Sequence, residues 1–340
     1  MLAVKIPRQN TIEVVNEDIP TPGEGEVLIR MKASALCRSD LYIYHGKSLF
    51  DSDSAQFTPG HEPCGIVEKL GSNVKGAKVG DRVAIYLVLS CGKCEHCLAG
   101  NWMLCSEAGF LGSTTNGAHA DYLVVPEDNC MLLPPEMDFI TGALATDVAG
   151  TLYTACKRLD VNGAKTVSIF GVGPMGMGGV LMAKAYGATV IAIDINDERL
   201  SLAKELGADY AVNAKNEDSV AEIRKLTRGN GADCAIVCSG VQQTMKEALE
   251  STKKLGTVGV IAESSACTID PSNDLLRKMI EIKGCWYFNR SDWTAISEFI
   301  INKKIPLSRI STKTFSLSEA VEAFTLFDSG KTQKVVFTWN

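Results

Sequence analysis

The 340-residue sequence lacks the features that mark membrane-spanning, exported and nucleic-acid-binding proteins. No stretch reaches the length of about 18 consecutive apolar residues that a membrane helix needs, and the opening MLAVKIPRQN contains no apolar signal-peptide core. The formal net charge of −6 argues against a basic nucleic-acid-binding face. Low-complexity tracts and internal repeats are also missing. We therefore expect a cytoplasmic globular protein with no nucleic-acid or membrane partner.

The composition and length of the sequence are typical of two domains, and the pattern of expected strands and helices differs between them. Apolar residues make up 46% and charged residues 22% of a chain too long for one core. Up to about residue 145, short strands alternate with turn residues, which predicts a strand-rich, partly closed β domain. From about residue 165, strands alternate with helices, as in KTVSIFGVG, PMGMGGVLMAKAYGA and TVIAID, which predicts a parallel sheet. One further helix is expected over TMKEALESTKKLG (residues 244–256), and the regularity fades after residue 285.

Twelve cysteines are present, and four of them lie in the segment CGKCEHCLAGNWMLC. Their spacing, C-x2-C-x2-C-x7-C, allows four sulfurs to surround one ion, as in closed structural zinc sites. An iron–sulfur signature would continue with x3-C-P instead, and disulfides are disfavoured in a chain without export features. We therefore predict a structural zinc. Its ligands would be Cys91, Cys94, Cys97 and Cys105.

A glycine-rich turn follows the first strand of the predicted parallel sheet. FGVGPMG has the form G-x-G-x-x-G, in which glycines allow a tight turn and a close approach to a pyrophosphate at a helix N-terminus. Asp194 ends the next strand, where a carboxylate would bind adenosine ribose hydroxyls and repel a 2′-phosphate. The pattern predicts an NAD site, with NADP the less favoured cofactor. The predicted turn residues are Gly171, Val172, Gly173, Pro174, Met175 and Gly176.

Spacing alone gives only a weak case for a second metal site. The chain has four histidines, and a histidine beside a turn, such as His61, is more often a satisfied polar group than a ligand. Cys37 by itself reads as a small buried apolar residue. Asp147 by itself reads as a solvated carboxylate or a helix N-cap.

Several fragments nevertheless occur in one order along the whole chain. They include GEVLIRMKASALCRSD, TPGHEPCGIVEKLGSNVKGAKVGDRV, CGKCEHCLAGNWMLC, FGVGPMGMGGVLMAKAYGA and GKTQKVVF. In these the sequence resembles the zinc-dependent medium-chain dehydrogenases, the family of alcohol, sorbitol, threonine and polyol dehydrogenases. The resemblance implies an α/β fold. A GroES-like β-barrel catalytic domain would span residues 1–147, a doubly wound Rossmann domain residues 148–284, and residues 285–340 would return to the first domain.

The resemblance also implies an open catalytic zinc, so that the chain would hold two zinc ions. Cys37 matches the cysteine of C-x-[ST]-D, and His61 matches the histidine of G-H-E. The third ligand position falls on Asp147. Glu62 matches a glutamate beside the metal that is a fourth ligand in some members. Water is the alternative there.

The same comparison assigns further roles, some of them open. Arg199 matches a position near the adenosine, and its alternative is a solvated helix charge. Arg38 matches an arginine that contacts pyrophosphate in some alcohol dehydrogenases and is glycine in many polyol enzymes. His119 in GAHADY matches a position that is usually Phe or His, which suggests packing.

The implied reaction is hydride transfer between NAD(H) and an alcohol, with Ser39 taking the proton of the reacting hydroxyl. Many relatives complete this relay with a histidine at the position of Tyr42, and tyrosine is a poor proton acceptor at neutral pH. Either His45 or water and ribose hydroxyls would replace it. Polar and aromatic segments favour a polyol, sugar or cyclitol. The alternatives are an enzyme of simple alcohols and aldehydes and a non-catalytic NAD- and zinc-binding protein. Members of the family are dimers or tetramers, so a homo-oligomer is expected.

Overall fold

The structure is a computed structural model that describes residues 1–47, 56–264 and 266–339. The chain divides into two compact units. Unit 1 comprises Met1–Asp147, Asn289–Ile301 and Leu307–Asn340, and unit 2 comprises Val148–Phe288 and Asn302–Pro306. Among the described residues, no helix is both long enough and apolar enough to cross a membrane.

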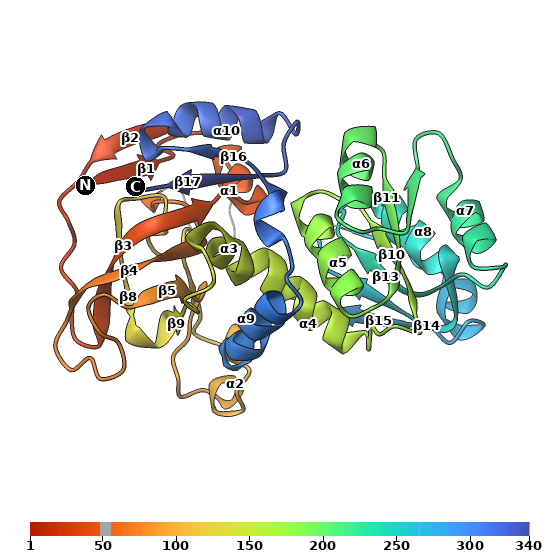
Figure 1. Ribbon diagram of the computed structural model, residues 1–340, viewed down its shortest axis with the longest axis horizontal. Coiled ribbons are helices and arrows are strands. Elements are labelled where there is room, and N and C mark those ends of the chain that lie inside the picture. Colours follow the sequence, from red (N-terminus) through yellow and green to blue (C-terminus); the bar gives the residue numbers. More distant parts are fainter. Residues whose placement is uncertain (48–55, 265, 340) are drawn as a thin grey trace. The chain divides into compact units, whose positions relative to one another are not determined.

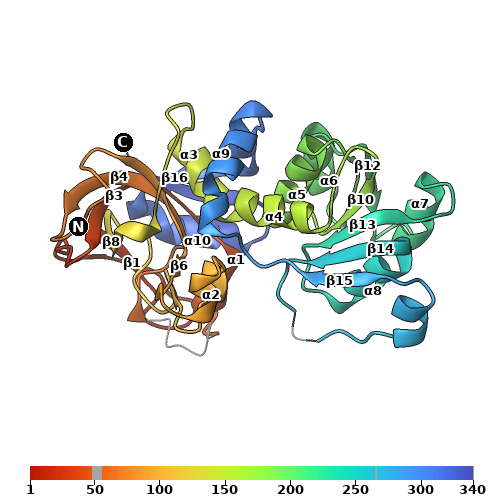
Figure 2. The same ribbon diagram turned by 90° about the horizontal axis from the view of Figure 1, so that it is seen from below.

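Unit 2 is built on a six-stranded parallel sheet with helices on both faces. Figure 2 shows α5 and α6 on one face and α8 on the other. The strand order is β12 (Tyr210–Asn213), β11 (Thr189–Asp194), β10 (Thr166–Phe170), β13 (Ala232–Val237), β14 (Thr252–Val260) and β15 (Glu281–Gly284). The helices are α4 (Gly150–Arg158), α5 (Pro174–Ala185), α6 (Asp197–Glu205), α7 (Ser219–Leu226), α8 (Gln242–Ser251) and a π-helix at Pro271–Leu276.

The central strands of this sheet are covered on both faces, which explains their uninterrupted apolar sequences. In β10 and β11 nearly every residue is buried. Side chains from β10, β11 and β13 pack with Met245, Ala248 and Leu249 of α8 in one core. The doubly wound parallel sheet expected from the sequence is confirmed.

One predicted boundary in unit 2 is wrong. The helix expected over residues 244–256 ends at Ser251, and Thr252 begins β14. Leu255 has a φ of 62°, which no helix accommodates. A Cβ at position 256 would lie 2.4 Å from Cγ2 of Thr252, so a glycine is required at this crowded strand entry. Propensity alone does not reveal either constraint.

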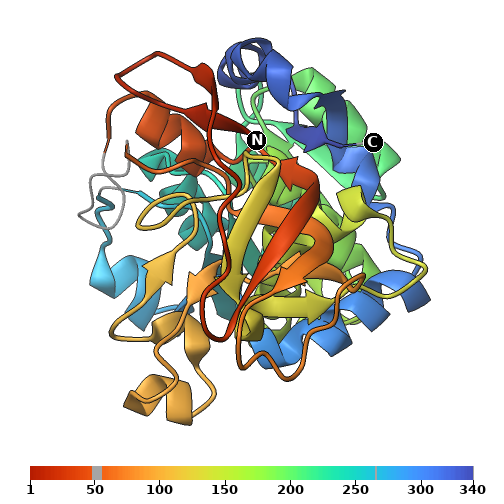
Figure 3. The same cartoon turned by 90° about the vertical axis from the view of Figure 1, so that its left-hand side faces the viewer.

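Unit 1 contains a curved, mainly antiparallel sheet, which faces the viewer in Figure 3. Its order is β16 (Ser311–Phe315), β17 (Lys334–Thr338), β3 (Glu26–Ala35), β4 (Glu62–Leu70), β5 (Arg82–Ile85) and β9 (Cys130–Leu132), with β8 (Tyr122–Pro126) also on β3. Two small ribbons accompany it, β1 (Leu2–Lys5) with β2 (Glu13–Asn16), and β6 (Val88–Leu89) with β7 (Gly109–Phe110). β17 pairs with β3, so the C-terminal segment is part of this sheet (Figure 1).

The helices of unit 1 are short. They are α1 (Arg38–Tyr44), α2 (Glu95–Leu98), α3 (Phe139–Leu144), α9 (Trp293–Asn302) and α10 (Ala320–Asp328). Single 3-10 turns occur at Trp102–Leu104, Glu127–Asn129, Arg290–Asp292, Leu307–Ile310 and Leu317–Glu319. Ile43 of α1 packs with Phe324 of α10 and Phe337 of β17, and this core fixes α1 against the sheet.

Candidate functional site

The pairing of β3 with β4 brings together residues that are distant in sequence. The two strands are antiparallel, and Ala35 at the end of β3 lies opposite Glu62 at the start of β4. Cys37 follows β3 as the N-cap of α1, and His61 directly precedes β4. The register of this pair therefore places Cys37, His61 and Glu62 at the same edge of the sheet.

Asp147 reaches this edge from a third segment. It lies in a π-helical turn, Ala145–Ala149, that continues α3, and such widened turns often occur at functional sites. Oδ2 of Asp147 lies 3.8 Å from Sγ of Cys37 and 3.9 Å from Nε2 of His61. The donor atoms of Cys37, His61, Glu62 and Asp147 all lie within 4.8 Å of one another.

His61 is oriented so that Nε2 faces these donors. Its other nitrogen, Nδ1, lies 3.8 Å from Oδ1 of Asp40, a carboxylate that is 1% exposed. Burial alone would raise the pKa of Asp40, but His119, the charge of His61 and the N–H of Cys37 together lower it to about 2. A carboxylate that is ionised at neutral pH and lies beside the second ring nitrogen of a histidine is a usual outer-shell partner of a metal-bound imidazole.

Ser39, the predicted proton acceptor, lies beside this group of donors. Its Oγ is 3.3 Å from Nε2 of His61. Both residues are partly buried, and Ser39 lies in the first turn of α1, two residues after Cys37. The structure thus brings the predicted metal donors and the predicted hydroxyl into one place.

Glu62 is buried and ion-paired with Lys334, which also donates a 3.0 Å hydrogen bond to the Leu36 carbonyl. Burial raises the pKa of Glu62 well above its usual range, Lys334 opposes this, and Cys37 and Asp147 add to it. Among the described residues, Oε2 of Glu62 has no hydrogen-bond partner. An unpartnered buried carboxylate oxygen beside a thiol and an imidazole fits a ligand of a divalent cation.

His45 is not brought into this group. It is the C-cap of α1 and is about two-fifths exposed, with Nδ1 2.8 Å from Oδ1 of Asn10 and Nε2 2.8 Å from Oδ1 of Asp328. Both ring nitrogens therefore have partners other than Ser39. The Lys47 ammonium lies over the ring of Tyr42, 5.1 Å from its centroid.

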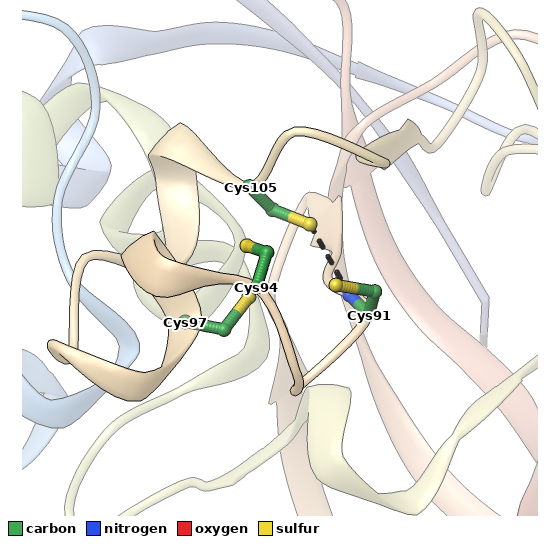
Figure 4. A group of neighbouring side chains, drawn as sticks. All are labelled: Cys91, Cys94, Cys97 and Cys105. Carbon is green, nitrogen blue, oxygen red and sulfur yellow. Dashed lines mark hydrogen bonds between the residues drawn. The ribbon is translucent and has the colours of Figure 1, made fainter.

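The four clustered cysteines surround one point, as Figure 4 shows. Their sulfurs lie within 4.8 Å of one another, and the twelve cysteines, all of which the described part of the chain includes, form no disulfide there. Backbone N–H groups of Cys91 and Glu107 donate to Sγ of Cys105 at 3.2 and 3.4 Å. The N–H groups of Cys97 and Ser106 lower the pKa of Cys94 to about 5, whereas burial raises the pKa of Cys97 to about 12. Amide donors that stabilise thiolates fit a closed four-sulfur metal site.

In unit 2, the glycine turn has the shape that a pyrophosphate requires. Gly171 has a φ of 84°, and a Cβ at Gly176 would lie 1.9 Å from the Gly171 carbonyl oxygen. A Cβ at Gly173 would meet only Nη1 of Arg199, at 4.0 Å, so the space over the turn is open. Pro174 begins α5, whose N-terminus therefore lies at the turn. Val172 is buried there, and Met175 is partly buried.

Asp194 is tied to this turn by its side chain. Oδ2 accepts from the N–H of Val172 at 2.8 Å, and Oδ1 accepts from the N–H groups of Ile195 and Asn196. Nη1 of Arg199 lies 4.0 Å from Oδ2 of Asp194. Arg38 is exposed in the first turn of α1 in unit 1, and its contact with pyrophosphate stays a prediction.

Sequence reasoning missed two residues of the site. Asp40 is the aspartate of the motif C-x-[ST]-D, and this motif and the three-residue distance from Cys37 were the signals available for it. Lys334 lies in the fragment GKTQKVVF, which carries part of the family resemblance, but nothing in that fragment indicates a contact with Glu62, 272 positions away.

Two family models match the chain. "Alcohol dehydrogenase GroES-like domain" matches residues 23–135, and "Zinc-binding dehydrogenase" matches residues 174–302. The chain is 34% identical to an L-threonine 3-dehydrogenase of Pyrococcus horikoshii over 96% of this chain and 94% of that one. It is 31% identical to a sorbitol dehydrogenase of Halalkalibacterium halodurans over 94% and 93%. It superimposes with a TM-score of 0.89 and 26% identity on a short chain alcohol dehydrogenase from Escherichia coli CFT073 complexed with NADH, over 100% and 99%.

Proposed function

Because the chain belongs to the zinc-dependent medium-chain dehydrogenase family, we propose that it transfers a hydride between NAD(H) and the secondary hydroxyl or carbonyl of a polyol, sugar or cyclitol. The convergence of Cys37, His61, Glu62 and Asp147 from three segments carries this proposal. Their thiolate, imidazole and carboxylate groups are the donors that zinc prefers.

The charges of the site favour a divalent cation. With a metal ion bound, Cys37, Glu62 and Asp147 would be ionised and contribute three negative charges, and Lys334 contributes one positive charge. The net of two negative charges in a largely buried place is what one zinc ion neutralises. A bound zinc supplies a Lewis acid that lowers the pKa of an alcohol. We propose Cys37, His61 and Asp147 as its ligands, with Glu62 or water in the fourth position.

The residues of the chain then have distinct tasks. Ser39 would accept a hydrogen bond from the substrate hydroxyl at Oγ and pass its own proton on towards solvent. A bound NAD⁺ would accept the hydride of the substrate C–H bond, so that alcohol and NAD⁺ give a carbonyl, NADH and a proton. Asp40 holds the ring of His61. The glycine turn binds the pyrophosphate, and Asp194 binds the ribose hydroxyls. With its ring nitrogens held by Asn10 and Asp328, His45 is the weaker alternative to water for the last step of the proton relay.

The substrate class rests on less direct support than the reaction. The sorbitol dehydrogenase relative supports a polyol, whereas the L-threonine 3-dehydrogenase relative supports a hydroxy amino acid. An enzyme of simple alcohols and aldehydes is the alternative, and a homo-oligomer is the expected assembly. A non-catalytic role would require a lost donor, and the four donors are present.

Zinc analysis of the purified protein tests the proposal. We expect about two zinc ions per chain, one in each donor group, and NAD-linked oxidation within a panel of polyols, simple alcohols and L-threonine. Asp147→Asn should lower the zinc content towards one and abolish oxidation. Cys267→Ser, at an exposed cysteine outside both groups, is the matched control. One zinc in the parent, unchanged by added metal, would overturn the proposal.

A further inference from the structure

His119 is a fully buried histidine that the proposed reaction does not use. It lies beside Asp40 and approaches the carboxylate oxygen that His61 does not approach. Its Nε2 is 3.7 Å from Oδ2 of Asp40, whereas His61 approaches Oδ1. Nδ1 of His119 lies 2.9 Å from Oγ of Ser34, which is also buried. Among the described residues, Nε2 of His119 has no hydrogen-bond partner.

The backbone fixes His119 against the loop that carries His61. The N–H of His119 donates to the Pro59 carbonyl at 2.9 Å, and Ala118 donates to the Gly60 carbonyl. Gly60 has a φ of 100°, and a Cβ there would lie 2.5 Å from Nδ1 of His119. The glycine before His61 is therefore required for the His119 ring to occupy its position.

The surroundings determine which nitrogen of His119 carries the proton. Nε2 faces an ionised carboxylate in a dry environment, where an unprotonated nitrogen would oppose the negative charge of Asp40. The Ser34 hydroxyl can donate to an unprotonated Nδ1. The network thus assigns the Nε2–H form, in which the protonated nitrogen lies 3.7 Å from Oδ2 of Asp40.

The two carboxylate oxygens of Asp40 have different neighbours, and each has one backbone N–H and one histidine ring beside it. Oδ1 accepts from the N–H of Gly60 at 3.0 Å and faces His61, while Oδ2 accepts from the N–H of Cys37 at 2.8 Å and faces His119. A carboxylate that shifted towards His119 or away from it would change its approach to the His61 ring. His119 therefore acts on His61 only through Asp40, which lies next to both rings.

We propose that His119 is a positioning residue for the metal site, which fixes Asp40 and through it the ring of His61. The inference rests on the proposed zinc site. It goes beyond a packing role, which the T-shaped contacts of the His119 ring with Phe337 and Phe324 would also satisfy. Packing needs an aromatic ring at this place, whereas positioning needs a polar donor at Nε2.

Three variants separate the two roles. His119→Phe keeps the ring and removes the donor, His119→Gln keeps a donor, and Phe337→Leu disturbs the packing of the ring without touching Asp40. The readout is the dissociation constant of each bound zinc, measured by chelator competition. The visible spectrum of cobalt at the Cys37 site gives a second readout.

We expect His119→Phe to weaken zinc binding at the Cys37 site about tenfold and to shift the cobalt bands. His119→Gln should stay within about threefold of the parent, as should Phe337→Leu, and zinc at the four cysteines should be unaffected. The inference is overturned if His119→Phe binds like the parent, if both His119 variants weaken binding equally, or if Phe337→Leu weakens it as much.

A measurement on the parent protein decides the matter if His119→Phe does not fold. With four histidines in the chain, ¹H–¹⁵N spectra of the imidazoles can be assigned. The Nε2–H form of His119 supports the inference, and the Nδ1–H form overturns it. A parent protein that binds only one zinc would overturn the proposed function, whereas unchanged variants of a two-zinc protein overturn only the role of His119.

Discussion

Asp194 combines two tasks in one side chain. Its two oxygens accept three backbone N–H groups around the glycine turn, and the same carboxylate is proposed to bind the ribose hydroxyls. Asp194→Asn removes the charge that repels a 2′-phosphate while Arg199 remains nearby. We expect the KM for NAD to rise about tenfold and the preference for NAD over NADP to shrink, since one charged hydrogen bond is worth about 1.5 kcal/mol.

Steady-state kinetics with both cofactors measure this change. Asp197→Asn, on the same helix entry but directed at Asn213, is the control. An unchanged cofactor preference in Asp194→Asn would show that this carboxylate serves only the turn.

Lys334 and Glu62 form a buried pair in which each charge depends on the other. Both side chains are at most 1% exposed. Lys334→Met leaves Glu62 without its cation and should lower the free energy of unfolding by about 3–5 kcal/mol. The double variant with Glu62→Gln should recover part of this loss, because it removes the unpaired charge.

Urea unfolding of the zinc-free proteins, with the exposed Lys303→Met as the control, measures the coupling of the two residues. Additive effects of the two substitutions would mean that they do not depend on each other.

At the residue scale, a site could be predicted from the sequence when its residues lie close together along the chain. The four cysteines lie within 15 positions, and the glycines within six, so their spacing alone indicates a common site. Cys37, His61 and Asp147 became a prediction only through a family resemblance, because their convergence depends on the β3–β4 register and on a π-helical turn. Lys334 in β17 and His119 in the loop before β8 reach the site through contacts between segments that are distant in sequence, which no local pattern encodes.

At the scale of elements, a carboxylate on a 3-10 turn holds the connection between β4 and β5. Glu127 accepts from the N–H groups of Gly76 at 2.7 Å, Lys75 at 3.0 Å and Ala77 at 3.4 Å, and these bonds lower its pKa. A pKa lowered by folding stabilises the protein above the usual range of glutamate. This contribution is lost as the pH falls through the lowered pKa of the folded state.

Glu127→Gln should therefore lower the free energy of unfolding by about 1 kcal/mol at pH 7. The difference from the parent should shrink as the pH falls below the usual glutamate range. Urea midpoints across this pH range measure it, with the exposed Glu136→Gln as the matched control. A difference that stays constant with pH would exclude a role for the charge of Glu127.

Two elements show that the local apolar pattern is not sufficient to predict where a strand or helix ends. The apolar run DRVAIYLVL predicts one strand, but it is divided into β5 and β6, which pair with β9 and β7 respectively. The predicted helix over residues 244–256 stops at Ser251 because the chain must begin β14. In both cases the available partners, and not the apolar pattern, decide where an element ends.

At the scale of the whole molecule, zinc is assigned to residues of unit 1 and NAD(H) to residues of unit 2. Every proposed zinc donor belongs to unit 1, and the glycine turn with Asp194 belongs to unit 2. Each unit has its own apolar core, made of β10, β11, β13 and α8 side chains in unit 2 and of Phe324, Phe337 and their neighbours in unit 1. Each ligand should therefore stabilise its own unit first.

Hydrogen exchange can separate these effects, because a ligand slows the opening of the structure that binds it. NADH should slow exchange most strongly in residues 171–176 and at Ile195 and Asn196, and NADPH should do so less. Removing zinc with a chelator should speed exchange at Cys91 and Glu107, whose N–H groups donate to Cys105. Strands such as β10 and β13 should be insensitive to the chelator.

Absence of NADH protection at residues 171–176 would contradict the assignment of the cofactor to this turn. Chelator effects confined to unit 2 would contradict both zinc sites.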